Sequence, residues 1–177
     1  MIETTHLVLR SWKEDDREPF ARMNADPRVM EFMPNRLTAT ECNSWVDWIK
    51  DHFARHCFGL YAVELKSDRR FIGFIGAQVP SFQAHFTPCV EIGWRLAADC
   101  WGKGLATEGA SAVVGHAFNA LGLASLVSFT VPANIRSRRV MEKLGMNRNP
   151  AEDFDHPKLP EGHPLRRHVL YRLARAD

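Results

Sequence analysis

The sequence predicts an α/β (α+β) fold, with a mixed and mostly antiparallel sheet of six to seven strands flanked by about four helices. Two apolar segments joined by a short polar turn, residues 58–65 and 71–79, indicate an antiparallel hairpin. A strand, a helix and a further strand follow between residues 89 and 131, which adds a parallel pair to the sheet. Helical segments surround these strands, so we expect helices on the faces of the sheet.

Six segments have the alternation or the composition of strands. In the fourth of them, Val90, Ile92 and Trp94 face one side of the sheet and Glu91 faces the other. The expected strands are residues 5–10, 58–65, 71–79, 89–94, 126–131 and 167–173.

Four segments repeat apolar residues at helical spacing and carry start or stop signals. Asn134 is a favourable N-cap for the fourth helix. Gly122 and Gly145 are expected to end the third and fourth helices in the left-handed conformation. The expected helices begin near Asp15, near Thr38 or Thr40, after Gly104 and after Asn134.

Length and charge limit the class of protein. At 177 residues we expect one domain over residues 1–177, with a core from about 5 to 174. A formal net charge of +2 without a long basic run argues against a nucleic-acid partner. The first residues lack a signal-peptide pattern, and no apolar segment reaches the length of a membrane span. We therefore expect a cytoplasmic protein, as a monomer or homodimer.

The cysteine and histidine patterns do not indicate a metal centre. The four cysteines are widely separated and form no C-x-x-C pair, which favours reduced thiols. His52 and His56 have a spacing that can bind a metal on a helix, but the sequence offers no zincin Glu and no third ligand nearby. No metal is expected.

The segment Gly102-Lys103-Gly104 follows the fourth strand and opens the third helix. Glycines at a helix start let backbone N–H groups approach phosphate oxygens closely, and Lys103 adds a positive charge. The residue order excludes the Walker pattern and matches the dinucleotide fingerprint poorly. The segment therefore predicts a site for a diphosphate-bearing cofactor of another class.

Flanking residues extend this pattern into a family resemblance. Residues 91–96 and 101–108 resemble motif A of the GCN5-related N-acetyltransferases (GNAT), whose loop binds the pyrophosphate of acetyl-CoA. Residues 134–146 are similar to the next segment of that family, N-x-x-S-x-x-v-x-e-K-L-G-F. Residues 7–10 and 24–30 resemble the RimJ/RimL-like branch, which acetylates the N-termini of ribosomal proteins.

The resemblance implies the acyl-CoA N-acyltransferase fold, with the fourth and fifth strands splayed, and acetyl-CoA as co-substrate. The pantetheine arm would pair with main-chain groups of residues 94–96 and contact Asn134, while loop amides would hold the pyrophosphate. Asp99 departs from the motif, which has Gln or Arg there. The implied cofactor-binding residues are Trp94, Arg95, Leu96, Trp101, Gly102, Lys103, Gly104, Leu105, Ala106, Thr107, Asn134 and Ser137.

The resemblance also suggests catalytic residues. Acyl transfer to an amine needs a neutral amine and a proton for the leaving thiolate. Many family members use a Tyr as the acid at the position of Met141, which cannot donate a proton. In the RimJ/RimL-like branch the serine at the position of Ser137 implies the thiolate partner, with first-turn surface as the alternative. Glu91 is the candidate base, directly or through water, or else a structural carboxylate.

The predicted function is an N-acetyltransferase that moves acetyl from acetyl-CoA directly to a primary amine, either a protein N-terminus or a small molecule. A second hypothesis is a catalytically idle, CoA-binding regulatory module, to which Met141 lends weight. A third, an NTP-binding enzyme, is disfavoured by the spacing of the glycines.

Overall fold

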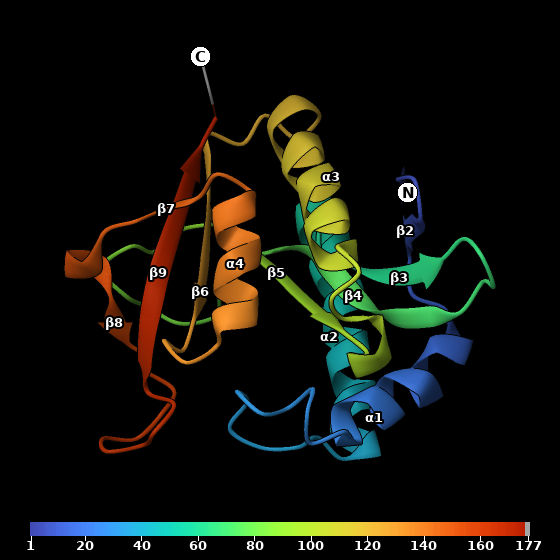
Figure 1. Cartoon of the computed structure of the whole chain (residues 1–177), viewed down its shortest axis with the longest axis horizontal. Helices are drawn as coiled ribbons and strands as arrows, with labels where there is room; N and C mark the ends of the chain where they lie inside the picture. The colour runs from blue at the N-terminus through green and yellow to red at the C-terminus, as the bar shows by residue number, and fades with distance from the viewer. Residues whose placement is uncertain (176–177) are drawn as a thin grey trace. The chain divides into compact units, whose positions relative to one another are not determined.

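The computed structural model describes residues 1–175 and divides the chain into two compact units (Figure 1). The first unit contains Met1–Gln78 and Gly93–Val113, and the second contains Val79–Ile92 and the chain from Val114 onwards. One domain over residues 1–177 stays a prediction, and its last two residues lie outside the described part of the chain.

The strands of residues 1–175 follow the order β1-β2-β3-β4-β5-β6-β9-β7, with β8 paired to β9. Nine strands stand where six to seven were predicted, because β1, β7 and β8 have two residues each and are too short for alternation to be visible. The strands are β1 (Ile2–Glu3), β2 (Leu7–Arg10), β3 (Leu60–Leu65), β4 (Phe71–Gln78), β5 (Glu91–Leu96), β6 (Ser125–Thr130), β7 (Asn147–Arg148), β8 (Phe154–Asp155) and β9 (Arg167–Ala174).

The sheet is mixed, as predicted. The pairs formed by β2 with β3, β3 with β4 and β6 with β9 are antiparallel. By contrast, β5 pairs with β6 in parallel, at Glu91↔Val127. This is the parallel pair predicted from the strand–helix–strand order of residues 89–131.

All four predicted helices are present, with local signals at their ends. Thr38 caps α2 in a capping box, in which the Glu41 N–H donates to Thr38 Oγ1 and the Thr38 N–H donates to Glu41 Oε2. Gly122 and Gly145 have φ of 67° and 78°, the left-handed values expected after α3 and α4. The helices are α1 (Arg17–Ala25), α2 (Ala39–His56), α3 (Leu105–Asn119) and α4 (Ile135–Lys143), with 3₁₀ turns η1 (Glu14–Asp16), η2 (Ala98–Cys100) and η3 (Pro150–Glu152).

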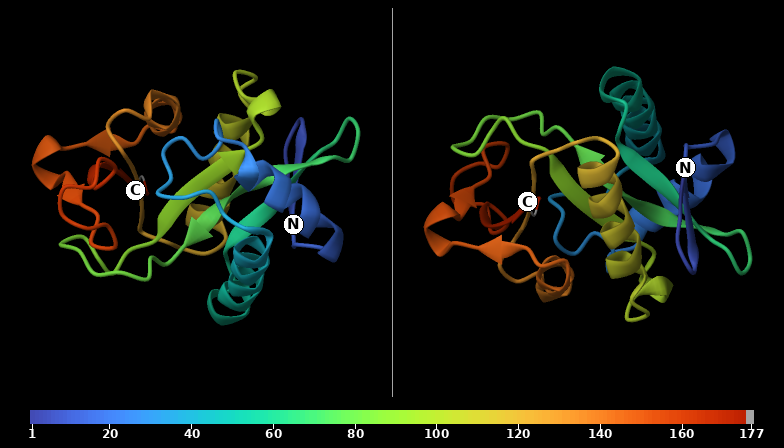
Figure 2. Two further views of the ribbon diagram at one scale, coloured as in Figure 1. Left: turned by 90° about the horizontal axis from the view of Figure 1, so that it is seen from below. Right: turned by 90° about the horizontal axis from the view of Figure 1, so that it is seen from above.

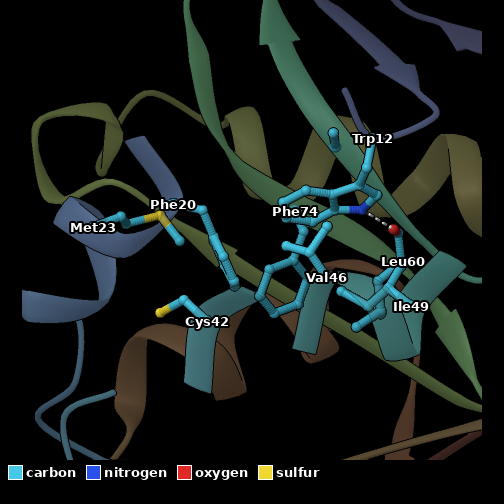
Figure 3. Close-up of a cluster of buried hydrophobic side chains, with 9 residues drawn as sticks. Trp12, Phe20, Met23, Cys42, Val46, Ile49, Leu60 and Phe74 are labelled. Carbon is cyan, nitrogen blue, oxygen red and sulfur yellow. Dashed lines mark hydrogen bonds between the residues drawn. The ribbon is translucent and has the colours of Figure 1, made fainter. Parts of the chain in front are cut away.

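In the first unit, helices cover both faces of the sheet (Figure 2). One face carries α1 and α2, whose side chains form a core with the strand residues Leu60, Ala62 and Phe74 (Figure 3). Trp12 belongs to this core and donates its indole N–H to the Leu60 carbonyl at 2.7 Å. The start of α3 lies on the other face, where Gly109 approaches Ile75. Alternating residues of β3 and β4 therefore serve two separate cores.

The first turn of α3 is also tied to the N-terminal segment. Glu108 accepts hydrogen bonds from Thr4 Oγ1 at 2.5 Å, from the His6 backbone N–H at 2.8 Å and makes a contact of 2.8 Å with His6 Nδ1. Burial raises the pKa of Glu108, but the bonds from Thr4 and His6 outweigh this and hold the pKa below its usual value. A carboxylate in the first turn is also favoured by the helix dipole.

Close backbone contacts fix β4 between its neighbours. A Cβ at Gly76 would lie 2.1 Å from the Gly59 carbonyl oxygen, and a Cβ at Gly73 would lie 2.1 Å from the Arg95 carbonyl oxygen. Both distances are far below van der Waals contact, so neither position accepts a side chain while the strands keep their places. The position of β5 in the first unit is thereby set by β4.

In the second unit, β6 and β9 pair over six positions, from Ser125↔Ala174 to Thr130↔Val169. Val127 and Leu170 point to one face, against Phe86 and Phe154, and Phe82, Phe129, His156 and His168 extend this aromatic cluster. Burial lowers the pKa of His156 to about 4, with smaller contributions from His168 and Lys158. The His156 side chain is therefore uncharged near neutral pH.

Gly76→Ala tests the close approach of β3 and β4. The added methyl group meets backbone that cannot move as a side chain would, so we expect the free energy of unfolding to fall by about 1–3 kcal/mol or more. Gly115→Ala in α3 is the matched control, because nothing lies within 4 Å of its Cβ position and Ala is the better helix former. It should raise stability by about 0.5–1 kcal/mol. Urea denaturation measures both; equal effects would contradict the proposed contact.

Candidate active site

The Gly102-Lys103-Gly104 turn lies between η2 and α3, in the first unit. Gly102 and Gly104 have φ of 74° and 80°, and nothing occupies the space where their Cβ atoms would be. Within α3, the Glu108 N–H is the donor to the Gly104 carbonyl, so the amides of the preceding helical residues have no partner one turn back. The backbone is thus open toward a ligand.

These features fit a diphosphate. Backbone N–H groups converge at the start of a 15-residue helix, whose dipole favours an anion there. Lys103 is exposed on the turn and adds a mobile cation. The predicted residues Leu105, Ala106 and Thr107 form the first turn of α3. The structure therefore gathers the predicted segment 101–107 in one place.

Asp99, which departs from the family motif, has a partner from another part of the first unit. Its Oδ2 accepts a hydrogen bond from Arg70 Nη1 at 2.7 Å, and Arg70 follows the turn between β3 and β4. This hydrogen bond lowers the pKa of Asp99. The carboxylate is therefore neutralised, and it holds a guanidinium beside the turn. Sequence reasoning missed Arg70, because the two residues are 29 positions apart.

Some main-chain N–H and C=O groups of β5 already have partners within the first unit, and the others are open to a ligand. The Arg95 carbonyl faces Gly73 of β4, and the Leu96 carbonyl accepts the Trp101 indole N–H at 2.8 Å. Since successive residues of a strand point their peptide groups to opposite edges, Trp94 and the Leu96 N–H lie on the edge away from β4. Of the three residues predicted to pair with pantetheine, these two keep suitable main-chain groups.

Asn134 is the N-cap of α4, as its sequence position predicts. Its Oδ1 accepts the Ser137 backbone N–H at 3.2 Å, and its Nδ2 donates to Thr130 Oγ1 at 3.0 Å. The side chain thus joins the end of β6 to the start of α4. Ser137 is partly buried in the first helical turn, and its Oγ makes no hydrogen bond within residues 1–175. That hydroxyl is therefore available to a ligand.

Glu91 lies near the start of β5, where it pairs with Val127 of β6. Burial raises the pKa of the Cys89 thiol to about 11; the Glu91 carboxylate adds to the shift and Arg172 opposes it. Ser137 lies beyond the far end of β6 at Thr130, which is three residues from Val127, or about 10 Å along the strand at ~3.3 Å per residue. Glu91 and Ser137 do not form a direct couple.

A family model described as an acetyltransferase (GNAT) domain matches residues 6–147, most of the chain. The chain belongs to the GNAT family of acetyltransferases. The motif resemblance in the sequence is confirmed.

Curated GNAT-like relatives include a bacterial and a fungal protein. YkkB of Bacillus subtilis is 30% identical over 82% of this chain and 84% of that protein. The FsC-acetyl coenzyme A-N(2)-transacetylase of Aspergillus fumigatus is 29% identical over 82% of this chain and 64% of that protein.

Solved structures share the GNAT fold along the chain. An acetyltransferase from Agrobacterium tumefaciens has a TM-score of 0.78 at 25% identity and covers 98% of this chain and 94% of its own. RimJ of Mycobacterium smegmatis, in complex with CoA-disulfide, has a TM-score of 0.74 at 21% identity and covers 95% of this chain and 81% of its own. The ribosomal-protein-S5-alanine acetyltransferase of Vibrio fischeri has a TM-score of 0.76 at 17% identity and covers 97% of this chain and 94% of its own. The latter two support the fold alone.

This GNAT chain contains two tyrosines, and both have structural roles. The Tyr171 hydroxyl donates to Glu142 Oε1 at 3.1 Å and accepts from Arg138 at 3.3 Å. Tyr61 is buried against Phe53, and burial raises its pKa. Met141 is itself buried. Because Tyr61 lies in β3 and Tyr171 in β9, neither takes the position on α4 where many family members have the acid, and Ser137 remains the candidate.

Other candidate features have structural explanations. His52 is buried with its Nδ1 2.9 Å from the Phe58 carbonyl, and its ring lies against His56. No group of three or more His, Cys, Asp or Glu in residues 1–175 could hold a metal ion. Over the same residues, no helix combines the length and the apolar character that crossing a membrane requires.

Asn134→Ala tests the cap of α4. Loss of the Oδ1 acceptor leaves the Ser137 N–H without its partner, so we expect the free energy of unfolding to fall by about 0.5–2 kcal/mol. Asn134→Asp keeps an acceptor at the same place and should retain most of the stability. Thermal or urea unfolding measures both. Equal losses for the two variants would show that the bond to Thr130, and not the cap, stabilises this junction.

Proposed function

We propose that this GNAT protein transfers acetyl from acetyl-CoA directly to a primary amine. The observation that carries the proposal is the open Gly102-Lys103-Gly104 turn at the start of α3, in a chain that matches the acetyltransferase domain. The name of the fungal relative, which includes acetyl coenzyme A, supports the choice of donor.

In this proposal, amides of residues 102–107 and the Lys103 ammonium hold the pyrophosphate of the cofactor, while the Trp101 N–H donates to the Ala98 carbonyl. Trp94 and the Leu96 N–H pair with the pantetheine arm, and Asn134 contacts it with the hydrogen-bonding capacity left by its cap. A backbone N–H near Ile92 or Gly93 polarises the carbonyl that is attacked. Acetyl-CoA, when bound, supplies the reactive thioester.

The chain's own residues move the protons. Glu91 takes a proton from the acceptor ammonium, directly or through a water molecule, which makes the amine nucleophilic. The amine nitrogen then bonds to the acetyl carbon and the carbon–sulfur bond breaks. Ser137 Oγ–H provides a proton to the leaving thiolate and regains one from the newly acylated nitrogen, which carries one proton more than the neutral amide, so that the hydroxyl is restored. The separation of the two residues along β6 suits these separate tasks.

The acceptor class stays open at this level. The names of several neighbours in fold refer to ribosomal proteins, which favours a protein N-terminus, whereas the fungal relative's name refers to FsC and not to a ribosomal protein. The sequence-based expectations of a cytoplasmic protein, a monomer or homodimer, without a nucleic-acid or membrane partner, stay predictions.

Lys103→Ala tests the cofactor site. Removal of one cation from the turn should raise the Kd for CoA about three- to tenfold and reduce its dependence on salt. Lys143→Ala removes an exposed lysine from the last turn of α4 and should leave the Kd unchanged. Isothermal titration calorimetry measures both. Equal Kd values for Lys103→Ala and the wild type would argue against a phosphate at this turn.

Ser137→Ala and Glu91→Gln test the catalytic assignments. Each should lower kcat/KM about a hundredfold or more, since each removes a proton transfer. Ser111→Ala and Glu161→Gln, at exposed positions, serve as controls. A thiol-release assay with peptide N-termini and small amines gives the rates. Normal kcat/KM in both Ser137→Ala and Glu91→Gln would refute the assignments, and tight CoA binding without acetylation of any acceptor would favour the idle module.

A further inference from the structure

Arg95 carries a positive charge in a neutral environment inside the first unit. Its Nη1 donates to Asn24 Oδ1 at 2.7 Å, and its Nη2 contacts Met33 Sδ at 2.9 Å. The guanidinium carbon lies 4.9 Å from the Trp45 ring centroid and 5.5 Å from that of Phe74. Within residues 1–175, no carboxylate forms an ion pair with Arg95.

The charge persists although burial opposes it. Burial lowers the pKa of Arg95 to about 10, and the group therefore stays protonated near neutral pH. The nearby Cys42 thiol is buried, and burial raises its pKa, so it supplies no negative charge there. The aromatic rings stabilise the cation only in part. A buried cation without a paired anion is costly for a fold to keep.

Arg10 shows how the same unit treats another partly buried arginine. Its side chain is 12% exposed and pairs with both Asp16 and Glu64 at 2.7 Å. The carboxylates raise its pKa, where burial alone would lower it. The charge of Arg10 is therefore balanced by two carboxylates, whereas Arg95 has no carboxylate partner within residues 1–175.

The donors of Arg95 are incompletely used. A guanidinium has five N–H groups in a planar fork that matches a carboxylate. One of the two contacts goes to a thioether, which is a weak acceptor. Met33 and Trp45 are partly exposed, and a ligand that bound the guanidinium would displace the Met33 contact. The main chain of residue 95 belongs to the strand proposed to face the thioester arm, but its side chain has no part in that proposal.

We propose that the Arg95 guanidinium binds a carboxylate of the acceptor, so that the substrate class is an amine that also carries a carboxylate. This inference rests on the proposed acetyl transfer. The CoA phosphates are assigned to residues 102–107, several residues further along the chain. The aromatic faces of Trp45 and Phe74 suit the hydrocarbon between the amine and the carboxylate.

The test compares acceptors that differ only in this charge. The acceptors are β-alanine against β-alaninamide, 4-aminobutyrate against its amide, and tripeptides beginning Ala-Asp against Ala-Asn. Rates are expressed per neutral amine, because the amide lowers the pKa of a nearby amino group. The wild type should favour the acid by about 10- to 100-fold in kcat/KM in at least one pair, as expected for a charged hydrogen bond. A ratio near one in every pair overturns the proposal.

Variants of the site separate recognition from stability. Arg95→Gln should bring the acid-to-amide ratio close to one while its Kd for CoA stays normal, and Arg95→Lys should keep part of the preference. Asn24→Asp places a competing carboxylate at the Oδ1 position that Arg95 already contacts, so the preference should also fall. Arg36→Gln removes an exposed arginine of the same unit and should retain the wild-type ratio. Unchanged preference in Arg95→Gln and Asn24→Asp would overturn the assignment.

A binding measurement keeps this inference distinct from acetyl transfer. The side-chain Nε resonance of Arg95, assigned through Arg95→Lys, should shift in the wild type on addition of β-alanine and stay unchanged with β-alaninamide. If no acceptor is acetylated, the proposed function fails, and this titration still decides the role of Arg95. Equal acetylation of acids and amides, without a selective shift, would reject carboxylate recognition and leave acetyl transfer intact.

Discussion

The backbone contacts of β4 set the positions of the elements that follow. Gly76 lets β4 lie against Gly59 before β3, and Gly73 lets it lie against the Arg95 carbonyl of β5. Because these contacts join main chain to main chain, they leave little freedom in the register of the strands. The end of β5, the η2 turn and the start of α3 follow within ten residues. The close backbone contacts of β4 thus help to fix the position of the Gly102-Lys103-Gly104 turn.

Much of the fold could be predicted because its signals are local. The capping box of Thr38, the cap at Asn134 and the glycine after α4 each act within a few residues, and all three are present. The long strands show their alternation in the sequence. The short strands β1, β7 and β8 do not, since two residues cannot show a period, and they form through pairing with partners far along the chain.

In the candidate site, too, local features could be predicted from the sequence and long-range contacts could not. The turn at residues 101–107 is continuous in sequence, so its glycines and lysine reveal an anion site directly. The surroundings of Arg95 are assembled from α1, the following loop, α2 and β4, and no spacing in the sequence brings Asn24, Met33 and Trp45 to it. The available clue was an arginine within the apolar strand Glu91–Leu96. The site for the acetyl donor can therefore be predicted from the sequence, while the site proposed to recognise the acceptor depends on tertiary structure.

The pair formed by Arg70 and Asp99 has a consequence for how this protein can change through evolution. Asp99 stands where the family motif has Gln or Arg, and it is accommodated because Arg70 neutralises it. Replacement of Asp99 alone by Arg would place two guanidinium groups together, and loss of Arg70 alone would leave a carboxylate beside the turn proposed to bind phosphate. Arg at position 99 is therefore unfavourable while Arg70 is present, and loss of Arg70 is unfavourable while Asp99 is present. Gln at position 99, whose side-chain oxygen can accept from Arg70, avoids both problems, so the effect of a change at one position depends on the residue at the other.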